Sequence, residues 1–424
     1  MHGVQPSPQV LPFREAREVV ERYAAQVPAP DSEALPSLEC LGRVLAEAVT
    51  ADRDLPPFHR STRDGYALRS ADVTSVPKTL RVVGELRAGD PAAARMPGLG
   101  EAVEIMTGAA APEGTDAVVM VEYTTRDSDA VSVLRTVEAG ENVVVRGSEA
   151  RAGDVLAAAG TRVTHATVAL AASTGRDTLK VYRRPTVAII STGDEVVAVS
   201  EHPKEHQIRN SNSYSLAAQV LRAGAVPIIL PIAPDDPERM RPLVARGLTA
   251  DVLLLSGGVS MGKYDFVEQV LETFEARVYF NGALIQPGKP VVFLDAAPAA
   301  PRMRATDQRV PVFGLPGNPV STMVTFDLFV RPVLDALTGA KPRPLRFSRL
   351  PLAKEIRTKT GLTRFLPAEI TGAFEDTRVQ LLTWRGSGDV VSVARSQCYI
   401  VVPPDCEHMA AGEMVPVFVP GCEL

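Results

Sequence analysis

Residues 251–266, DVLLLSGGVSMGKYDF, join an apolar run, a glycine pair and a polar loop to the start of the next apolar segment. The run VLLL within it is apolar throughout, which is typical of a strand covered on both faces of its sheet. Gly257 and Gly258 follow one residue later, and without side chains they let the backbone approach a phosphate closely. The stretch predicts a strand, a ligand-binding loop and a helix in succession.

The same order of strand, loop and helix recurs across residues 181–336. It is seen in TVAIISTGDE (186–195), SLAAQVLRAGAVPIILPIAPDDPERMRPLV (215–244) and VPVFGLPGNPVSTMVTFDLFV (310–330). Such alternation is typical of a mostly parallel sheet with helices on both faces. Ligands bind such sheets at the carboxyl ends of the strands, where helix N-termini offer free N–H groups to phosphate. We therefore expect a phosphate-bearing ligand over the loops STGDE, SGG and LPGNP.

The segments outside residues 181–336 have different patterns of apolar residues. Residues 12–50 carry two apolar runs at helical spacing, around Ala16–Tyr23 and Leu41–Ala48, which predict two helices joined by the proline-rich VPAPDSEALPS. Residues 51–147 contain short strands such as TLRVVGEL, AVEIMTG and DAVVMVEYT. After the linker ALTGAKPRPLRF, about six short strands predict a terminal β-barrel or sandwich.

Together these patterns predict a multidomain α+β protein, since 424 residues exceed what a single core organises. We expect a helical domain I (1–50 and 148–180), a small β-rich domain II (51–147), a mostly parallel, three-layer α/β domain III (181–336) and a C-terminal β-barrel domain IV (337–424).

Composition limits the partners. The net charge of −5 and the pI near 5.8 argue against nucleic acid, whose binding depends on clustered lysine and arginine. No segment approaches the ~18 uninterrupted apolar residues of a membrane span, and the first residues lack a secretory pattern, so the cytoplasm is expected. The four cysteines have neither the spacing of a zinc site nor the density of a disulfide scaffold.

Carboxylates follow two of the predicted strands. Asp265 lies behind the glycine pair and either caps the next helix or is an oxygen ligand for magnesium. Asp194 and Glu195 stand in the same relation to TVAII. Two acidic loops at one edge of a sheet favour a magnesium–phosphate site over two separate helix caps.

Further polar residues lie in stiff or helix-leading loops. Lys289 in IQPGKP is either a solvated lysine in a turn or a point charge for an oxyanion. Asn318 and Ser321 in GLPGNPVST precede an apolar helix, which they cap or through which they hold a ligand. His202 and His206 have the spacing of helical metal ligands, but the proline between them favours a loop.

The stretch STRDGYALRSADV (61–73) contains Asp64 directly before a glycine. Asp-Gly is the commonest short signal for a tight turn, so Asp64 is by itself either a turn residue or a functional carboxylate.

An ordered set of motifs extends over nearly the whole chain. It comprises DLPPFHRSTRDGYALRSAD, IMTGAAAPEGTDAVVMVE, STGDE, RNSNSYSLAAQVLRAGA, DDPE, SGGVSMGKYDF, QPGKP, GLPGNPVST and GSG. This set closely resembles the molybdopterin molybdenumtransferase family, which includes bacterial MoeA and the E domain of gephyrin. The resemblance implies an L-shaped homodimer of four-domain subunits, in which domain III binds molybdopterin. It also implies magnesium-dependent insertion of molybdate into adenylylated molybdopterin, with release of AMP.

The resemblance carries residue roles with it. It implies an active site shared between subunits, with catalytic positions at Asp64, Thr107, Glu149, Glu195, Asp235 and Asp265, of which Asp64, Glu195 and Asp265 handle the metal. It implies substrate binding by Ser191, Thr192, Gly193, Ser256, Gly257, Gly258, Ser260, Lys289, Pro290, Pro316, Gly317, Asn318, Ser321, Arg364 and Ser387. Of these, Lys289, Pro290, Ser321 and Ser387 resemble the lining of the family's oxyanion pocket. A molybdopterin adenylyltransferase is the expected partner, with no nucleic acid or membrane.

Several positions depart from the family pattern. Glu149 stands where an aspartate is usual, and Gln286 stands where KPGKP sequences have lysine, which removes one positive charge from the oxyanion pocket. Leu362 and Pro367 occupy places where arginine is frequent, although Arg364 is close enough in sequence to serve instead. Near the end, SQC replaces the usual alanine-asparagine-glycine. These differences concern molybdate affinity more than fold or pterin binding.

Two alternative functions are considered. A related α/β domain performs adenylyl transfer to molybdopterin, and a protein that keeps the pterin pocket without turnover would be a scaffold or carrier. The four-domain layout argues against the first alternative, and the presence of Asp64, Glu195 and Asp265 argues against the second.

Overall fold

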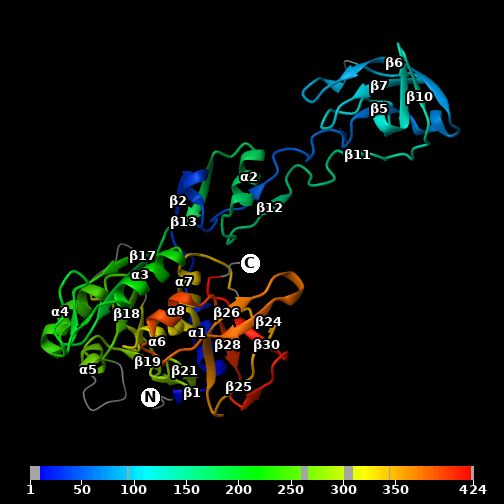
Figure 1. Cartoon of the computed structure of the whole chain (residues 1–424). Coiled ribbons are helices and arrows are strands. Elements are labelled where there is room, and N and C mark those ends of the chain that lie inside the picture. The colour runs from blue at the N-terminus through cyan, green and yellow to red at the C-terminus, as the bar shows by residue number, and fades with distance from the viewer. Residues whose placement is uncertain (1–9, 93–94, 259–265, 300–308, 343, 422–424) are drawn as a thin grey trace, which may run out of the picture.

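The computed structural model describes residues 10–92, 95–258, 266–299, 309–342 and 344–421. The molecule is elongated and bent (Figure 1). A β-sheet that contains β5 (Gly65–Leu68) lies at one end, and α2 (His165–Ser173) lies in the middle. The other end holds an α/β part beside a second β-sheet. In the described part of the chain, no helix combines the length and apolar character needed to cross a membrane.

The α/β part is built on a six-stranded sheet of order β17-β14-β18-β23-β22-β19. Four neighbouring strands are parallel, as predicted: β17 (Val226–Ile229), β14 (Thr186–Ser191), β18 (Val252–Ser256) and β23 (Val310–Leu315). β22 (Val292–Ala296) and β19 (Arg277–Phe280) are antiparallel, so the sheet is mixed.

Alternate side chains of these strands enter two separate cores. Ile189 and Leu254 pack on one face with α3 (Asn212–Arg222), α6 (Pro319–Thr325) and α1 (Phe13–Ala24). Ile190 and Leu255 pack on the other face with α4 (Pro237–Gly247) and α5 (Phe266–Glu272). Because both faces are covered, the strands are apolar throughout, and their polar residues gather where the strands end.

The C-terminal sheet has the order β21-β26-β28-β30-β24. Its strands are β21 (Ile285–Gln286), β26 (Thr363–Thr371), β28 (Cys398–Val402), β30 (Met414–Phe418) and β24 (Ser348–Pro351), with β27 (Arg378–Leu381) beside β26. A bridge between Leu352 and Val379 joins the end of β24 to β27, so that five strands follow one another around one core.

The C-terminal sheet is continuous with the α/β part in two ways. β21 belongs to the connection between β19 and β22, yet it pairs with β26. Phe365 and Phe418 of the C-terminal sheet also belong to the same apolar core as α1, α3 and α6. Residues 285–290 therefore lie where the two parts meet.

The predicted second helix over residues 41–48 is wrong. This segment instead forms single bridges, Val44 with Arg162 and Leu45 with Val181, and is followed by β3 (Val49–Thr50), which pairs with β12 (Val155–Ala157). Long-range strand pairing forms here instead of a helix because it buries Leu45 and Val49 against apolar side chains of residues 163–181. β2 (Ser32–Pro36) likewise pairs with β13 (Thr178–Tyr182), so the middle part combines short strands with α2.

The far sheet has the order β8-β5-β7-β6-β10-β9. Besides β5 it contains β6 (Lys78–Leu86), β7 (Glu101–Ile105), β8 (Ala117–Met120), β9 (Thr124–Asp127) and β10 (Ala130–Val133), which confirms the strands predicted there. The short pair β4 (Arg60–Ser61) and β11 (Val143–Val144) leads to it from the middle part.

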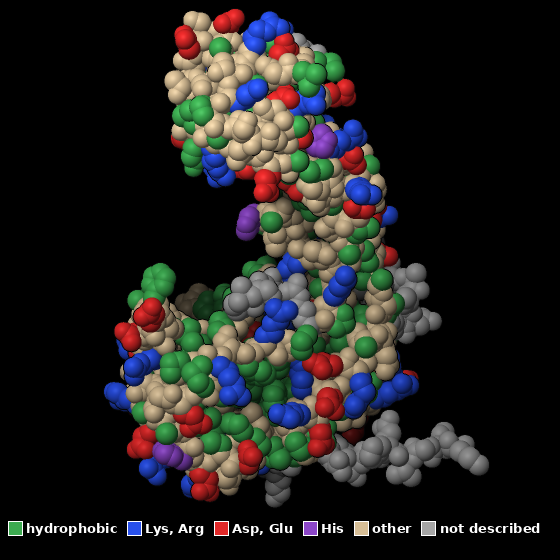
Figure 2. Space-filling model, turned by 90° about the vertical axis from the view of Figure 1, so that its right-hand side faces the viewer, with side chains coloured by type: hydrophobic (Ala, Val, Ile, Leu, Met, Phe, Trp, Pro, Cys, Tyr) green, Lys and Arg blue, Asp and Glu red, His purple; other side chains and the backbone are tan. Residues whose placement is uncertain are grey.

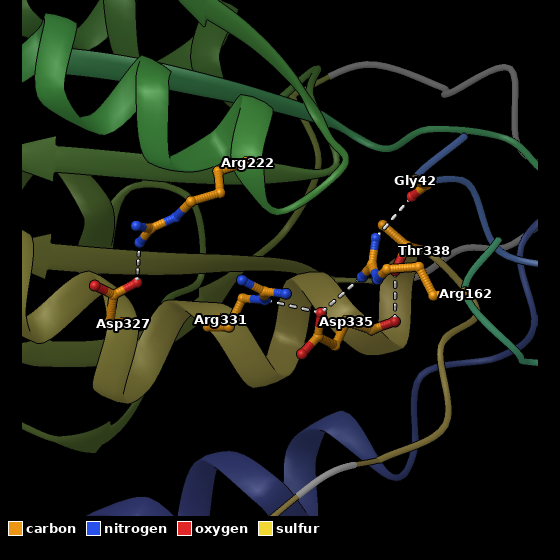
Figure 3. Close-up of polar contacts among 7 residues, drawn as sticks. All are labelled: Gly42, Arg162, Arg222, Asp327, Arg331, Asp335 and Thr338. Atoms are coloured by element: carbon orange, nitrogen blue, oxygen red, sulfur yellow. Dashed lines mark hydrogen bonds and ion pairs between the residues drawn. The ribbon is translucent and has the colours of Figure 1, made fainter. Parts of the chain in front are cut away.

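The middle part is joined to the α/β part by partly buried polar contacts (Figure 3). Arg162 donates to the carbonyl oxygen of Gly42 at 2.8 Å and pairs with the Asp335 carboxylate at 3.3 Å. Asp335 lies on α7 (Arg331–Leu337), where it also accepts from Arg331 at 2.9 Å. These contacts connect the two parts through a fixed set of donors and acceptors.

Candidate active site

A cavity of about 340 Å³ lies at the carboxyl ends of β14, β18 and β23. The three loops predicted to bind phosphate meet there. The predicted residues that line the cavity are Ser191, Thr192, Gly193, Glu195, Asp235, Ser256, Gly257, Gly258, Pro290, Pro316 and Gly317.

The glycine loop after β18 is shaped by close backbone contact. Gly257 has φ +95°, and a Cβ added there would lie 2.8 Å from the carbonyl oxygen of Thr192. Both the left-handed backbone and the missing space require glycine. The loop after β14 and the loop after β18 are therefore held against each other at the edge of the cavity.

Sequence reasoning assigned no role to three polar residues around the start of α3. The buried Ser191 hydroxyl contacts Asn210 Oδ1 at 2.9 Å and the Ser213 hydroxyl at 2.8 Å. Asn212 Nδ2 donates to Ser256 Oγ at 2.9 Å and to the carbonyl oxygen of Gly317 at 2.7 Å. The sequence RNSNSYS could have indicated these residues, because polar residues directly before a helix often cap it or hold a ligand.

Two side-chain oxygens in this cavity are buried without a hydrogen-bond partner in the described structure, Thr192 Oγ1 and Asn212 Oδ1. Buried polar atoms are normally paired, so these two point to a ligand that supplies their partners. Thr192 was predicted as a substrate-binding residue, whereas Asn212 was not.

Carboxylates gather at the acidic side of the cavity. The backbone N–H of Asp235 donates to Asp194 Oδ1 at 3.3 Å, and Glu195 lines the same cavity. Partial burial, followed by repulsion from Asp194 and Glu195, raises the pKa of the Asp235 carboxyl. Within the described ranges, no group of three or more His, Cys, Asp or Glu side chains is arranged to hold a metal ion. His202 and His206 therefore do not belong to such a group among the described residues. Asp265 and Ser260 lie outside the described residues.

A second cavity, of about 410 Å³, adjoins the first and shares Pro290 and Pro316 with it. Lys289, Asn318, Ser321 and Ser387 line it, and so do residues that were not predicted to bind substrate, among them Gln286, Leu362 and Trp384. Among its described lining residues, Lys289 is the single charged one. Such a cavity suits a small anion.

Close packing and a backbone hydrogen bond hold the loops of the second cavity in place. Gly288 has φ +109°, and a Cβ there would lie 2.5 Å from Thr325 Cγ2, so the turn that carries Lys289 requires glycine. The carbonyl oxygen of Ser387 accepts from the backbone N–H of Val320 at 3.0 Å. This bond ties the Ser387 loop of the C-terminal sheet to α6 of the α/β part.

Arg364 is not among the residues that line the second cavity. It is buried behind Gln286, donates to Gln286 Oε1 at 2.8 Å, and also donates to the carbonyl oxygen of Leu362 at 3.1 Å.

Asp64 and Thr107 contact each other far from both cavities of the same chain. Asp64 precedes β5, in the far sheet, and a wide notch separates that sheet from the body below (Figures 1 and 2). Asp64 Oδ1 accepts from the backbone N–H of Thr107 at 2.6 Å and from its hydroxyl at 2.8 Å, and these bonds lower the pKa of the exposed Asp64 carboxyl. Glu149 pairs with Arg60 at 3.5 Å. One chain thus brings together most of the predicted residues that are described in the α/β and C-terminal parts, except Arg364, but not Asp64, Thr107 or Glu149.

Three known protein families match successive parts of the chain. Residues 11–175 match the MoeA N-terminal region (domain I and II), residues 188–336 a probable molybdopterin binding domain, and residues 349–419 the MoeA C-terminal region (domain IV). A molybdopterin molybdenumtransferase of Synechococcus elongatus is 35% identical over 415 residues, which span 96% of this chain and 99% of the relative. The chain belongs to the MoeA family.

Other MoeA relatives agree, and the family predicted from the motifs is confirmed. A molybdopterin molybdenumtransferase of Nostoc sp. is 36% identical over 80% of this chain and 76% of its own length. The crystal structure of a molybdopterin biosynthesis MoeA protein from Pyrococcus horikoshii is 28% identical, with a TM-score of 0.76 over 97% of this chain and 100% of that one.

Proposed function

We propose that this chain is a molybdopterin molybdenumtransferase that inserts molybdate into adenylylated molybdopterin and releases AMP, giving molybdenum cofactor. The observation that carries the proposal is the pair of adjoining cavities, one with glycine loops and unpaired buried oxygens and the other with Lys289 as its single described charge. This arrangement suits a phosphate-bearing pterin that lies next to an oxyanion.

The first cavity would hold the pterin and its phosphoanhydride. The glycine loops at Gly257 and Gly317 would let a phosphate approach the backbone closely, and the start of α3 adds the positive end of a helix. Thr192 Oγ1 and Asn212 Oδ1 would take their missing hydrogen bonds from the substrate. Ordering the substrate in this way fixes its sulfurs relative to the second cavity.

The second cavity would hold molybdate as the second substrate. Lys289 offers a point charge, while Ser321 and Ser387 offer hydroxyl donors from opposite sides of the boundary between the α/β and C-terminal parts. Because the two cavities share Pro290 and Pro316, an oxyanion there lies beside a ligand in the first cavity.

We propose that magnesium binds at the acidic side of the first cavity. Burial raises the pKa of the Asp235 carboxyl first, and negative charge from Asp194 and Glu195, which a cation would offset, raises it further. We propose that Glu195 and Asp265 hold Mg²⁺ together with Asp64 of the partner subunit. When bound, Mg²⁺ withdraws charge from the phosphoanhydride and makes AMP a better leaving group.

A homodimer with shared active sites is part of the proposal. The separation of Asp64 from its own cavities supports it, since a second subunit must bring that carboxylate to the cleft. Apolar side chains on α3 and the edge strand β17 also support it, because Tyr214 is 53% exposed, Leu221 59% and Ile229 43%. A molybdopterin adenylyltransferase would deliver the substrate, and the setting would be the cytoplasm.

The test compares two reactions of the purified full chain with Mg²⁺. With adenylylated molybdopterin, we expect AMP release that depends on molybdate. With molybdopterin and ATP, we expect no pyrophosphate release, since that product would identify an adenylyltransferase instead. Tight binding of the adenylylated pterin without AMP release would identify a scaffold or carrier and overturn the proposal.

A further inference from the structure

Gln286 and Arg364 form a pair at the boundary between the α/β part and the C-terminal sheet. The parallel pairing of β21 with β26 sets Gln286 directly opposite Arg364. Arg364 is 8% exposed, and its Nε donates to Gln286 Oε1 at 2.8 Å. Its Nη1 donates to the carbonyl oxygen of Leu362 at 3.1 Å.

This contact decides which way the Gln286 amide points. A guanidinium group has donors and no acceptor, so the atom that faces it must be the carbonyl oxygen of the amide. The Gln286 NH₂ group therefore points away from Arg364. It has no hydrogen-bond partner among the described residues, and Gln286 lines the second cavity.

Arg364 also brings charge to this place. No carboxylate among the described residues pairs with its guanidinium, whose two recorded acceptors are both neutral. A buried cation without a counterion is unfavourable by itself, and an anion nearby offsets that cost. Arg364 lies one side chain behind the cavity, so its field adds to that of Lys289.

We propose that Gln286 donates a hydrogen bond to the oxyanion, and that Arg364 is the positioning residue that holds the Gln286 amide and makes the cavity prefer a doubly charged oxyanion. This inference rests on the proposed function, because it concerns the oxyanion site of that reaction. It reverses the expectation that Gln286 is only a lost charge and that Arg364 contacts the oxyanion itself.

The test is equilibrium dialysis of molybdate, a dianion, and perrhenate, a monoanion of similar shape, against the full chain. Gln286→Glu keeps an acceptor for Arg364 but presents a carboxylate oxygen to the cavity. We expect the Kd for molybdate to rise by about tenfold to a hundredfold, the range of a hydrogen bond to a charged group. Arg364→Gln should reduce the preference for molybdate over perrhenate, and Arg364→Lys should restore most of it.

The ratio of the two dissociation constants separates this role from a structural one, because loosened packing would weaken both anions equally. Thermal unfolding of each variant verifies the fold. If the wild-type chain binds molybdate and both Gln286→Glu and Arg364→Gln bind it within about twofold with an unchanged ratio, the inference is wrong and the transferase proposal stands. If the wild-type chain binds no molybdate and releases no AMP, both are wrong.

Discussion

Mixed dimers test whether the active site is shared between subunits. One subunit carries Asp64→Asn and the other Glu195→Gln, so neither homodimer retains a complete cleft. Asp64 Oδ1 accepts both bonds from Thr107, and the asparagine oxygen can accept the same two, so the substitution removes charge while keeping the local contacts. We expect each homodimer to lose about a hundredfold or more of its AMP release, the range for removing one electrostatic contribution at a reacting phosphate.

The recovered activity follows from the arrangement. Random association of equal amounts makes half of the dimers mixed, and each mixed dimer combines one intact Glu195 with the intact Asp64 of the partner subunit at one of its two clefts. Recovery should therefore reach about a quarter of the wild-type rate in the unfractionated mixture and about half in mixed dimers isolated through both tags. The assay is AMP release after co-expression with two different affinity tags, with each homodimer as its own control. Mixed dimers no more active than the homodimers would refute a cleft built from the far sheet of one subunit and the α/β part of the other.

Two further predictions concern charges in the α/β part. Burial and repulsion from Asp194 and Glu195 raise the pKa of Asp235 in the folded protein. The protonated Asp235 carboxyl therefore contributes its full stabilisation of the fold below its ordinary pKa, and this stabilisation is lost as the pH rises through the raised pKa. Asp235→Asn should then raise the melting temperature near pH 7 with little effect near pH 4, and a lower melting temperature near pH 7 would contradict this reading. Arg222 pairs with the buried Asp327 at 2.8 Å, so Arg222→Met should lower the free energy of unfolding by about 2–4 kcal/mol and Arg222→Lys by less, as measured by urea denaturation. Equal losses for both variants would show that a positive charge alone at position 222 does not stabilise Asp327.

The parts of the site that were predictable are those coded by neighbouring residues. The runs VAII, VLLL and VPVFGL are apolar throughout because both faces of the sheet are covered, so their strands and the loops behind them could be found from the sequence. The glycines behind β18 carry the same local signal. The ordered motifs then identified the family, which the comparisons confirm.

The parts that were missed depend on contacts between distant segments. Residues 41–48 have helical spacing, but their partners Arg162 and Val181 lie more than a hundred residues away and draw them into strand pairing. The bond between Gln286 and Arg364 joins residues 78 positions apart, through a strand that leaves the α/β part and enters the C-terminal sheet. Asn212 looks like an ordinary residue at a helix start, and only the fold brings it to Ser256.

The most direct test of the proposed transferase is the ratio of molybdenum in the pterin product to AMP released, measured in a single turnover of the full chain with Mg²⁺ and molybdate. We predict that AMP and molybdenum-containing pterin appear together, in about equal amounts, and that neither appears without molybdate. AMP release at the same rate without molybdate, or AMP without molybdenum in the product, would contradict the coupling of insertion to hydrolysis on which the account depends.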